Sequence, residues 1–371
     1  MTQYRVDRLV IKPSLKCTAN CSGCASRREL HHHLSREVQL SLGQWEEILE
    51  DAAGIGLKNL HISGGEPTLY PELVGLVRAG KRLGLRVRIN SNGSMINSEL
   101  AGNLLRAGLD EICISIYSHE PGIHNGFRKS INLWEKATRA VELLAEMRKD
   151  FPGFLLGTMS IILRENYRSF AELVEFHHNL GSQQMGISYL EGDFSGRYLL
   201  NSSEISEFRD QVVPRIADYC RGLHPSIRNR AVNVARALYG KEIGDVDDLS
   251  HGRYWNRNYC NVPKTAGLIM ANGDVHPCNI VEYTHGPVMG NLLKNSFRDI
   301  WYSAKWDGYR ETLHRKCALC PVNIYTALPL SSEIKSSMPV TLYHSRVFSP
   351  FRPLAGKLMD LYREQKHRMA R

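Results

Sequence analysis

An α/β fold is predicted, in which a parallel sheet forms an open or closed barrel and a small second domain with a β-hairpin follows. Up to Leu190, six short apolar segments alternate with segments of helical periodicity, and parallel strands need helices as crossovers. Asn272-Gly273, between two further apolar segments, is the strongest short signal for a hairpin. The 371 residues, of which 43% are hydrophobic, suffice for one barrel-sized domain and a smaller one.

The strands and helices of the predicted barrel follow each other at short intervals. Apolar runs bounded by turn residues indicate the strands. Ser41 and Pro71 mark helix starts, because serine caps a helix N-terminus and proline fits its first turn. We expect strands at 9–11, 59–62, 87–90, 111–117, 155–163 and 185–190, and helices after Ser41 and at 71–83, 98–107, 133–147 and 167–179. The chemistry of such folds gathers at the carboxyl ends of the strands.

Beyond the barrel the pattern becomes mixed. Residues 202–220 have helical spacing, the hairpin pairs 266–270 with 274–276, and 296–305 is a further predicted helix. After Pro353, an apolar stripe among basic residues predicts an amphipathic helix, and we favour its docking on the body over a membrane surface. The expected organisation is a barrel at 1–222, a connector at 223–258, a second domain at 259–330 and a C-terminal tail at 331–371.

Composition and charge exclude several classes of protein. No apolar run reaches the roughly 18 residues that a spanning helix needs, and no signal peptide is visible, so we expect a cytoplasmic protein. Nine cysteines, seven of them in short-spaced groups, indicate metal ligands in a reducing compartment. The net charge of +9 is spread along the chain without interleaved aromatics, which favours a solvated basic surface over a nucleic-acid partner. A small anionic substrate is compatible with this charge.

Cys17, Cys21 and Cys24 follow the first predicted strand in a loop. Three thiolates within a short arc can bind three irons of a cubane and leave the fourth iron open for another ligand. The alternative is a zinc site, but tetrahedral zinc needs a fourth ligand. The nearby candidates, His31–His33, lie in a polar stretch that we predict to be exposed. An iron–sulfur cluster is therefore the favoured interpretation.

This spacing, together with Gly64-Gly65-Glu66-Pro67 after the second strand, resembles the radical S-adenosylmethionine (SAM) superfamily. The resemblance implies a [4Fe–4S] cluster whose open iron is chelated by the amino and carboxylate groups of SAM. In that family the Gly-Gly-Glu motif takes the amino group through a backbone oxygen and the carboxylate, and glycines permit a close backbone approach. Asn90, Ser91, Asn92, Gly93 and Ser115 resemble the ribose and carboxylate contacts of the family. His124 and Arg128, beyond the fourth strand, also match a recurring pattern of the family, and Arg128 is a candidate SAM contact.

The resemblance extends from Leu9 to Leu190 and implies the partial (β/α)6 barrel of the family. It departs at one position, because most members have an aromatic residue beside the adenine just before the third cysteine, where this chain has Gly23. Met185 and Ile187 on the sixth strand are the candidate substitutes for that adenine contact. The alternative is that both are core residues.

Four further cysteines surround the predicted hairpin, namely Cys260, Cys278, Cys317 and Cys320. Four thiolates saturate one cluster, and zinc is the alternative ligand. The Cys-x12-Gly-x4-Cys spacing and Gly290-Asn291-Leu292 resemble the auxiliary-cluster extension called SPASM, or Twitch in its shortened form. The segment carries fewer cysteines than the full form, so we expect the Twitch type with one auxiliary [4Fe–4S] cluster.

The resemblance implies a radical SAM enzyme that cleaves SAM reductively to a 5′-deoxyadenosyl radical, with a reductant such as flavodoxin or ferredoxin as partner. We expect a small polar substrate, sugar-like or natural-product-like, because only sixteen residues precede Cys17 and leave no room for a leader-binding domain. Modification of a peptide is the main alternative. A metal protein that binds nucleic acid without radical chemistry would leave the Gly-Gly-Glu-Pro motif unexplained.

The expected reaction removes a hydrogen atom from the substrate and ends as a two-electron oxidation, with the auxiliary cluster as electron acceptor. A fully ligated cluster cannot chelate substrate, so electron transfer or structural support are the roles left to it. The alternatives are decarboxylation and redox-neutral epimerisation, in which a thiol of Cys113 or Cys220 donates hydrogen. Glu191 or Asp193 is the candidate base at the barrel mouth. The other residues expected to meet the substrate there are Tyr117, His119, Glu120, Tyr189 and Arg197.

Overall fold

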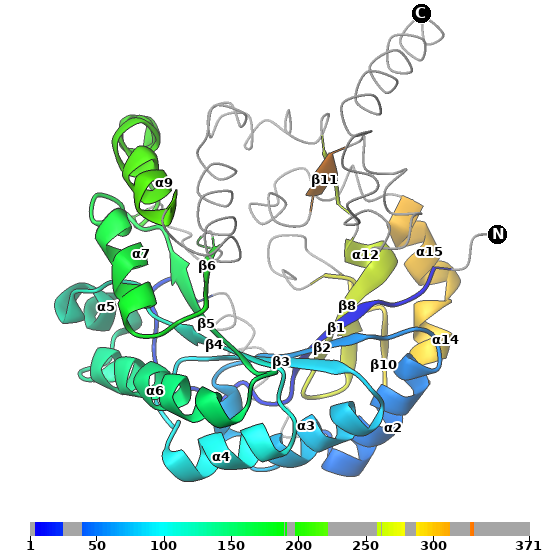
Figure 1. The fold of residues 1–371 in the computed structure, drawn as a ribbon. Coiled ribbons are helices and arrows are strands. Elements are labelled where there is room, and N and C mark those ends of the chain that lie inside the picture. The colour runs from blue at the N-terminus through cyan, green and yellow to red at the C-terminus, as the bar shows by residue number, and fades with distance from the viewer. Residues whose placement is uncertain are drawn as a thin grey trace, which may run out of the picture.

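The structure, a computed structural model, describes residues 4–24, 39–188, 190, 197–221, 258–260, 262–278, 287–311 and 327–329. Among these residues the main feature is a nine-stranded sheet in the order β10-β9-β8-β1-β2-β3-β4-β5-β6. In Figure 1 the strands follow an open arc, and the helices that connect them lie on its outer side. The expected α/β fold with a partial barrel is confirmed.

Six parallel strands form the barrel part of the sheet, as predicted. Neighbours pair in chain order, from β1 with β2 to β5 with β6. The bounds agree with the predicted ranges to within two residues, because short runs or alternations of apolar residues are the direct signal of strands with a buried face. The strands are β1 (Arg8–Lys12), β2 (Asn59–Ile62), β3 (Arg86–Ser91), β4 (Glu111–Ser115), β5 (Leu155–Ile161) and β6 (Gln184–Ser188).

The connecting helices pack their apolar faces on the convex side of the sheet. Ser41 caps the first of them as predicted, and its hydroxyl accepts a hydrogen bond from Gln44 N at 3.3 Å. Trp45 then packs with Leu60 in the main core. Because strand side chains alternate, every second strand residue faces this core and the others face the inside of the arc. The helices are α2 (Leu42–Ala53), α3 (Leu73–Arg82), α4 (Ser98–Arg106), α6 (Leu133–Met147) and α7 (Phe170–Asn179).

One helix of the barrel, α5 (Pro121–Arg128), is absent from the sequence prediction. Pro121 opens it, and Lys129 ends it in the left-handed conformation with a φ of 49°. Two glycines interrupt its short sequence, and glycine lowers helix propensity. The periodicity signal is therefore weak, although the helix lies directly against the cysteine loop.

The predicted hairpin is confirmed, and it extends the barrel sheet. β8 (Ala266–Met270) and β9 (Asp274–His276) are antiparallel and turn at Gly273, whose φ of +83° favours glycine. β8 also pairs in parallel with β1, in the register Leu9↔Gly267, and β10 (Gly290–Asn291) pairs with β9. These strands continue the same sheet at the edge opposite β6. The domain boundary at residue 259 stays a prediction.

The remaining elements lie at the two ends of the arc. The predicted helix at 202–220 consists of three consecutive helical segments, and the one at 296–305 divides into two helices. Most of the connector and all of the tail at 331–371 lie outside the described residues. No described helix is long and apolar enough to cross a membrane. The elements are α8 (Ser202–Glu207), η3 (Phe208–Val212), α9 (Val213–Arg221), β7 (Asn258–Cys260), α12 (Val262–Thr265), α14 (Phe297–Trp301), α15 (Ala304–Glu311) and β11 (Ala327–Pro329).

Candidate cofactor site

The three cysteines of the first group lie in the loop that leaves β1 at the carboxyl edge of the sheet. The thiol of Cys17 is exposed, those of Cys21 and Cys24 are half-buried, and none forms a disulfide. Within the described residues, no three His, Cys, Asp or Glu side chains converge on the position of a single metal ion. A cubane cluster does not require the thiols to converge on one point, because each thiolate binds a different iron.

The glycine motif after β2 packs directly on the backbone of the cysteine loop. Ser14 O accepts a hydrogen bond from Gly65 N at 3.1 Å, and Lys16 O accepts one from Glu66 N at 2.7 Å. A Cβ atom on Gly64, whose φ is +133°, would lie 2.3 Å from Ser14 O, and one on Gly65 would lie 2.2 Å from Lys16 O. Both glycines are therefore required for the contact between the two loops, in addition to any approach to a ligand.

Glu66 joins the glycine motif to the loop after β3. Its side chain is fully buried. One carboxylate oxygen accepts hydrogen bonds from Ser91 Oγ at 2.7 Å and from Thr68 N at 3.1 Å, and the other accepts one from Asn92 N at 2.6 Å. The carboxylate is thus fixed by neighbouring loops before any cofactor is considered.

Asn92 extends this network to the first cysteine. Its Nδ2 lies 3.7 Å from Cys17 Sγ and donates to Thr18 Oγ1 at 3.0 Å. Thr18 Oγ1 is also 2.7 Å from Ser94 Oγ. The loops after β1, β2 and β3 therefore form one hydrogen-bonded unit at the carboxyl ends of the strands.

The carboxyl end of α5 holds the cysteine loop from the other side. Ser22 N donates to Phe127 O at 2.9 Å, and Asn20 N donates to Arg128 O at 3.1 Å. The last carbonyls of a helix lack partners within the helix, and here amides on both sides of Cys21 supply them. α5 therefore positions the middle cysteine through the backbone.

Arg128 places a buried positive charge beside the thiols. Its side chain is 5% exposed, and the guanidinium carbon lies 4.8 Å from the centre of the Tyr117 ring. Burial alone would lower the pKa of Arg128, but Tyr117 and the thiols of Cys21 and Cys17 raise it above its usual value. Its Nε has no hydrogen-bond partner among the described residues. Arg128 therefore has a donor available for an anion at this site.

His124 and Tyr117 complete this side of the site. His124 Nδ1 accepts a hydrogen bond from Tyr117 N at 3.1 Å. Burial, together with the positive charge of Arg128 and the neighbouring His177, lowers the pKa of His124 to about 3. Burial also raises the pKa of Tyr117, against the opposing effect of Arg128. At neutral pH the imidazole is uncharged and the phenol keeps its proton.

Gly23, the departure from the family pattern, has a packing explanation. A Cβ atom there would lie 2.5 Å from Cδ1 of Leu190, which is buried beside the cysteine loop in a cluster with Tyr117. Met185 and Ile187, the predicted substitutes for the aromatic residue, instead pack on the outer face of β6 with residues of α7 and α9. The structure thus favours the core interpretation for both, and Leu190 is a neighbour of the site that the sequence analysis missed.

Two further candidates, Cys113 and Ser115, lie on the inner face of the arc, whereas Cys220 does not. Cys113 is buried on β4 between Asn90 of β3 and Gly157 of β5, and Ser115 is on the same face of β4. Cys220 is fully buried in the outer core with α7. Of the two predicted hydrogen donors, Cys113 is therefore the one that the structure puts on the barrel side.

Three more candidates at the barrel mouth, besides Tyr117, lie among the described residues. The His119 ring lies 6.5 Å from the Phe176 ring of α7, and Glu120 precedes the first turn of α5. The guanidinium carbon of Arg197 lies 5.4 Å from the centre of the Tyr198 ring. His119 Nε2 lies 4.0 Å from Glu120 Oε1, so these two candidates are neighbours at the barrel mouth. Tyr189, Glu191, Asp193 and His31–His33 lie outside the described residues.

The second cysteine group is described in part. Cys278 is half-buried just beyond β9, and Cys260 in β7 pairs with Ala327 of β11. Cys317 and Cys320 lie outside the described residues. Ligation by these four cysteines stays a prediction.

The donors at the first site suit a [4Fe–4S] cluster with SAM. Three thiols lie on one loop that is held from both sides, as three of the irons require. The buried guanidinium of Arg128, with its available Nε, suits a negatively charged cluster or a carboxylate group.

Comparison with protein families agrees with this site. Residues 11–177 match the radical SAM superfamily, and residues 260–321 match an iron-sulfur cluster-binding domain named SPASM. The chain is 26% identical to the AdoMet-dependent heme synthase of Methanosarcina barkeri, over 82% of this chain and 85% of that protein. It is 24% identical to the PqqA peptide cyclase of Streptomyces rochei, over 84% of this chain and 81% of the cyclase.

Solved structures share the fold. Streptococcus suis SuiB bound to its precursor peptide SuiA is similar with a TM-score of 0.61 and 18% identity, over 86% of this chain and 71% of SuiB. anSMEcpe with bound AdoMet and the Cp18Cys peptide is similar with a TM-score of 0.59 and 17% identity, over 86% of this chain and 87% of anSMEcpe.

Proposed function

The chain is a radical SAM superfamily enzyme with a SPASM iron–sulfur domain, and on that premise we propose that it modifies a peptide. Its cofactors are SAM and a [4Fe–4S] cluster, and its SPASM domain binds auxiliary iron–sulfur clusters. When bound, cluster and SAM supply a carbon radical that removes hydrogen from a substrate. We propose Cys17, Cys21 and Cys24 as the ligands of the barrel cluster.

We propose that the remaining residues of the site orient SAM. Arg128, with a buried guanidinium and an available Nε, is suited to the carboxylate of SAM. Glu66 and Asn92 keep the glycine motif against the cysteine loop. Leu190, beside Gly23, is the proposed apolar neighbour of the adenine, in place of the aromatic residue of other members.

A peptide substrate is better supported than the small molecule expected from the sequence. Among the similar proteins, several are named PqqA peptide cyclase, and SuiB and anSMEcpe are each described with a bound peptide. The similarity to a heme synthase makes a non-peptide substrate the second candidate. Two-electron oxidation remains our proposal for the reaction, and a thiol of Cys113 is the donor to be tested for the epimerisation alternative.

The observation that carries the assignment of cluster and SAM to the barrel is the cysteine loop held between the Gly64-Gly65-Glu66 motif and α5. Anaerobic reconstitution should give about eight irons and eight sulfides per chain for two clusters. With dithionite and SAM, the enzyme should then form 5′-deoxyadenosine.

Replacement of Cys17, Cys21 and Cys24 by Ala should remove half of the iron and all 5′-deoxyadenosine formation. Cys278→Ala is the matched control, and it should keep part of the SAM cleavage, because Cys278 belongs to the other group. Equal losses in both variants, or zinc in place of the second four irons, would contradict the assignment.

The substrate class is tested by incubating the reconstituted enzyme with short peptides encoded beside its gene. Mass spectrometry should find a peptide product that has lost two hydrogens. If no such peptide changes mass while 5′-deoxyadenosine still accumulates, the non-peptide candidate takes precedence. Deuterium from heavy water in a product of otherwise unchanged mass would favour epimerisation, and Cys113→Ala would then abolish it.

A further inference from the structure

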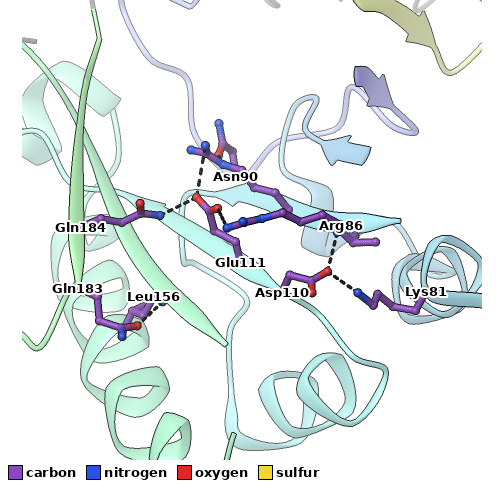
Figure 2. Close-up of polar contacts among 10 residues, drawn as sticks. Lys81, Arg86, Asn90, Asp110, Glu111, Leu156, Gln183 and Gln184 are labelled. Carbon is purple, nitrogen blue, oxygen red and sulfur yellow. Dashed lines mark hydrogen bonds and ion pairs between the residues drawn. The ribbon is translucent and has the colours of Figure 1, made fainter. Parts of the chain in front are cut away.

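The inner face of the barrel carries an ion network that the cofactor site does not use. Glu111, the first residue of β4, is only 4% exposed. Its carboxylate accepts a hydrogen bond from Arg86 at 3.1 Å, lies 3.3 Å from Arg88 Nη1 and accepts one from Gln184 Nε2 at 2.6 Å. Figure 2 shows Glu111 between Gln184 and Arg86. Strands β3, β4 and β6 thus meet at one carboxylate.

The network depends on the absence of a side chain in β5. Gln184 and Glu111 belong to strands that are separated by β5, and Gly157 of β5 is the register partner of Gln184. A Cβ atom on Gly157 would lie 3.0 Å from both Cγ and Nε2 of Gln184. Gln184 therefore reaches Glu111 across the glycine, and this contact fixes the carboxylate that holds Arg88.

The network carries more positive than negative charge. Arg86 and Arg88 share the single carboxylate of Glu111. The side chain of Arg86 is 55% exposed, so water screens it, whereas that of Arg88 is 27% exposed. Arg88 also donates from Nε to Asn90 Oδ1 at 3.3 Å. These contacts use Nε and Nη1, and the guanidinium has five donors in all.

His61 on β2, the register partner of Arg88, is affected by the same excess of positive charge. Burial, together with the charges of Arg88 and Arg8, lowers the pKa of His61 to about 3, against the opposing effect of a hydrogen bond with Asn90. The neutral imidazole has a buried Nε2 without a hydrogen-bond partner among the described residues. An unpaired buried polar atom costs free energy, and a bound anion would recover it if Nε2 carries the proton.

We infer that Arg88 and His61 form a carboxylate-binding site on the inner face of the barrel, which takes an acidic group of the substrate. The inference rests on the proposed function, because the inner face is then the substrate side. Arg88 precedes Asn92 of the cofactor site by four residues along the chain. At roughly 3.3 Å per strand residue, it therefore lies about 13 Å from Asn92, toward the amino end of β3. An extended peptide would place the acidic residue about four positions from the modified one.

Three small compounds serve as probes of the reconstituted enzyme. Acetyl-glutamate amide offers a side-chain carboxylate, acetyl-glutamine amide is its neutral isostere, and acetylglycine offers a terminal carboxylate. Phenylglyoxal labelling of arginines, mapped by mass spectrometry, reports occupancy. Either carboxylate should slow the labelling of Arg88 and leave the labelling of Arg86 unchanged. The compound that protects Arg88 more strongly shows whether the site prefers a side-chain or a terminal carboxylate. The inference is overturned if the neutral isostere protects equally, or if neither carboxylate protects.

Variants separate binding from structural support. Arg88→Gln should weaken binding of the carboxylate probe, measured by NMR titration, by about tenfold or more, because a charge-assisted pair is lost. Arg86→Gln is the matched control, since it loses a contact with the same carboxylate of Glu111, and it should change binding less than about twofold. Equal losses in both would make the network a structural tie and nothing more.

A second variant covers the case in which Arg88→Gln does not fold. Arg88→Gln with Glu111→Gln keeps hydrogen-bonding groups on the inner face without buried charge. It should fold and still lack carboxylate binding, and retained binding would refute the inference. The wild-type enzyme is assayed in parallel for 5′-deoxyadenosine. If that product is absent, the proposed function fails; if it forms and carboxylates leave Arg88 unprotected, the inference alone fails.

Discussion

A single carboxylate determines how two loops of the cofactor site meet. Glu66 is fully buried, and its carboxylate accepts hydrogen bonds from Thr68, just after the glycine motif, and from Ser91 and Asn92 at the end of β3. Buried acceptors of this kind stabilise a fold when satisfied and destabilise it when one partner is removed. Glu66 therefore has a structural role that the motif comparison alone does not suggest.

Glu66→Gln tests this role. The amide would turn one acceptor into a donor that faces Ser91 or Asn92, so the free energy of unfolding should fall by about 1–3 kcal/mol. Urea denaturation measures the change, and calorimetry should find weaker SAM binding. Glu72→Gln, on the neighbouring segment, is the control and should alter neither quantity. An unchanged stability of Glu66→Gln would mean that the carboxylate serves the cofactor alone.

Buried histidines make the barrel sensitive to acid. The pKa of His124 and that of His177 are each lowered to about 3, chiefly by burial. The unfolded chain binds these protons near pH 6.5, so the stabilisation is complete above pH 6.5 and is lost as pH falls toward 3. Between pH 6.5 and 5, each histidine should cost roughly 2 kcal/mol of unfolding free energy.

His124→Asn isolates one of these contributions. Its side-chain oxygen can accept the hydrogen bond of Tyr117 N but does not titrate. The variant should lose less stability than wild type between pH 7 and 5 in urea denaturation, by roughly 2 kcal/mol. Identical pH dependence in the two proteins would show that the pKa of His124 is the same in the native and unfolded states.

At this scale, the sequence predicts residues whose chemistry is local. Cys17 and Gly64 belong to short motifs, and the spacing alone indicates their use. Gly23 is different, because the absence of a side chain there is explained by packing against Leu190, which is distant in the chain. Arg88 and Glu111 were missed for the same reason, since their contact joins two strands and has no sequence spacing of its own.

At the scale of elements, α5 is the helix that periodicity did not predict, although the cofactor site depends on it. Its last carbonyls accept the amides on both sides of Cys21. Its end is set by Lys129, the one non-glycine residue with positive φ among the described residues. Helices commonly end in this conformation with glycine, which has no steric penalty there. The bounds of the strands, by contrast, were predicted closely because the pattern of apolar residues along each strand indicates its buried face directly.

Two substitutions of Lys129 test the helix end. Lys129→Gly should raise unfolding free energy by up to about 1 kcal/mol or leave it unchanged, whereas Lys129→Val should lower it by about 1–2 kcal/mol, because a β-branched residue resists positive φ. The Val variant should also retain less iron after reconstitution, since α5 holds the cysteine loop. If iron content stays equal while stability falls, α5 does not position the cluster ligands.

At the scale of the whole molecule, one sheet joins the two halves of the chain. β8 pairs with β1 over five residues, which places the hairpin on the opposite side of β1 from β2. Trp301 of α14 donates from its indole to Tyr4 O at 2.9 Å, and Arg310 of α15 lies over both rings, 4.5 Å from Trp301 and 4.9 Å from Tyr4. The sequence predicted the hairpin but not this pairing, because a register between distant strands leaves no local pattern.

This continuity predicts that the described halves unfold together. Arg310 is 4% exposed and donates to Pro263 O at 3.0 Å, so Arg310→Met should lower the free energy of unfolding by about 2–4 kcal/mol through lost hydrogen bonds and cation–π contacts. Urea unfolding should remain one transition when followed by tryptophan fluorescence and by the absorbance of the clusters. Arg298→Ala, which removes an ion pair with Asp51 from a half-exposed side chain, is the control and should cost less than about 1 kcal/mol. Two separate transitions would contradict the argument, because strands that share a ladder lose their buried backbone partners together.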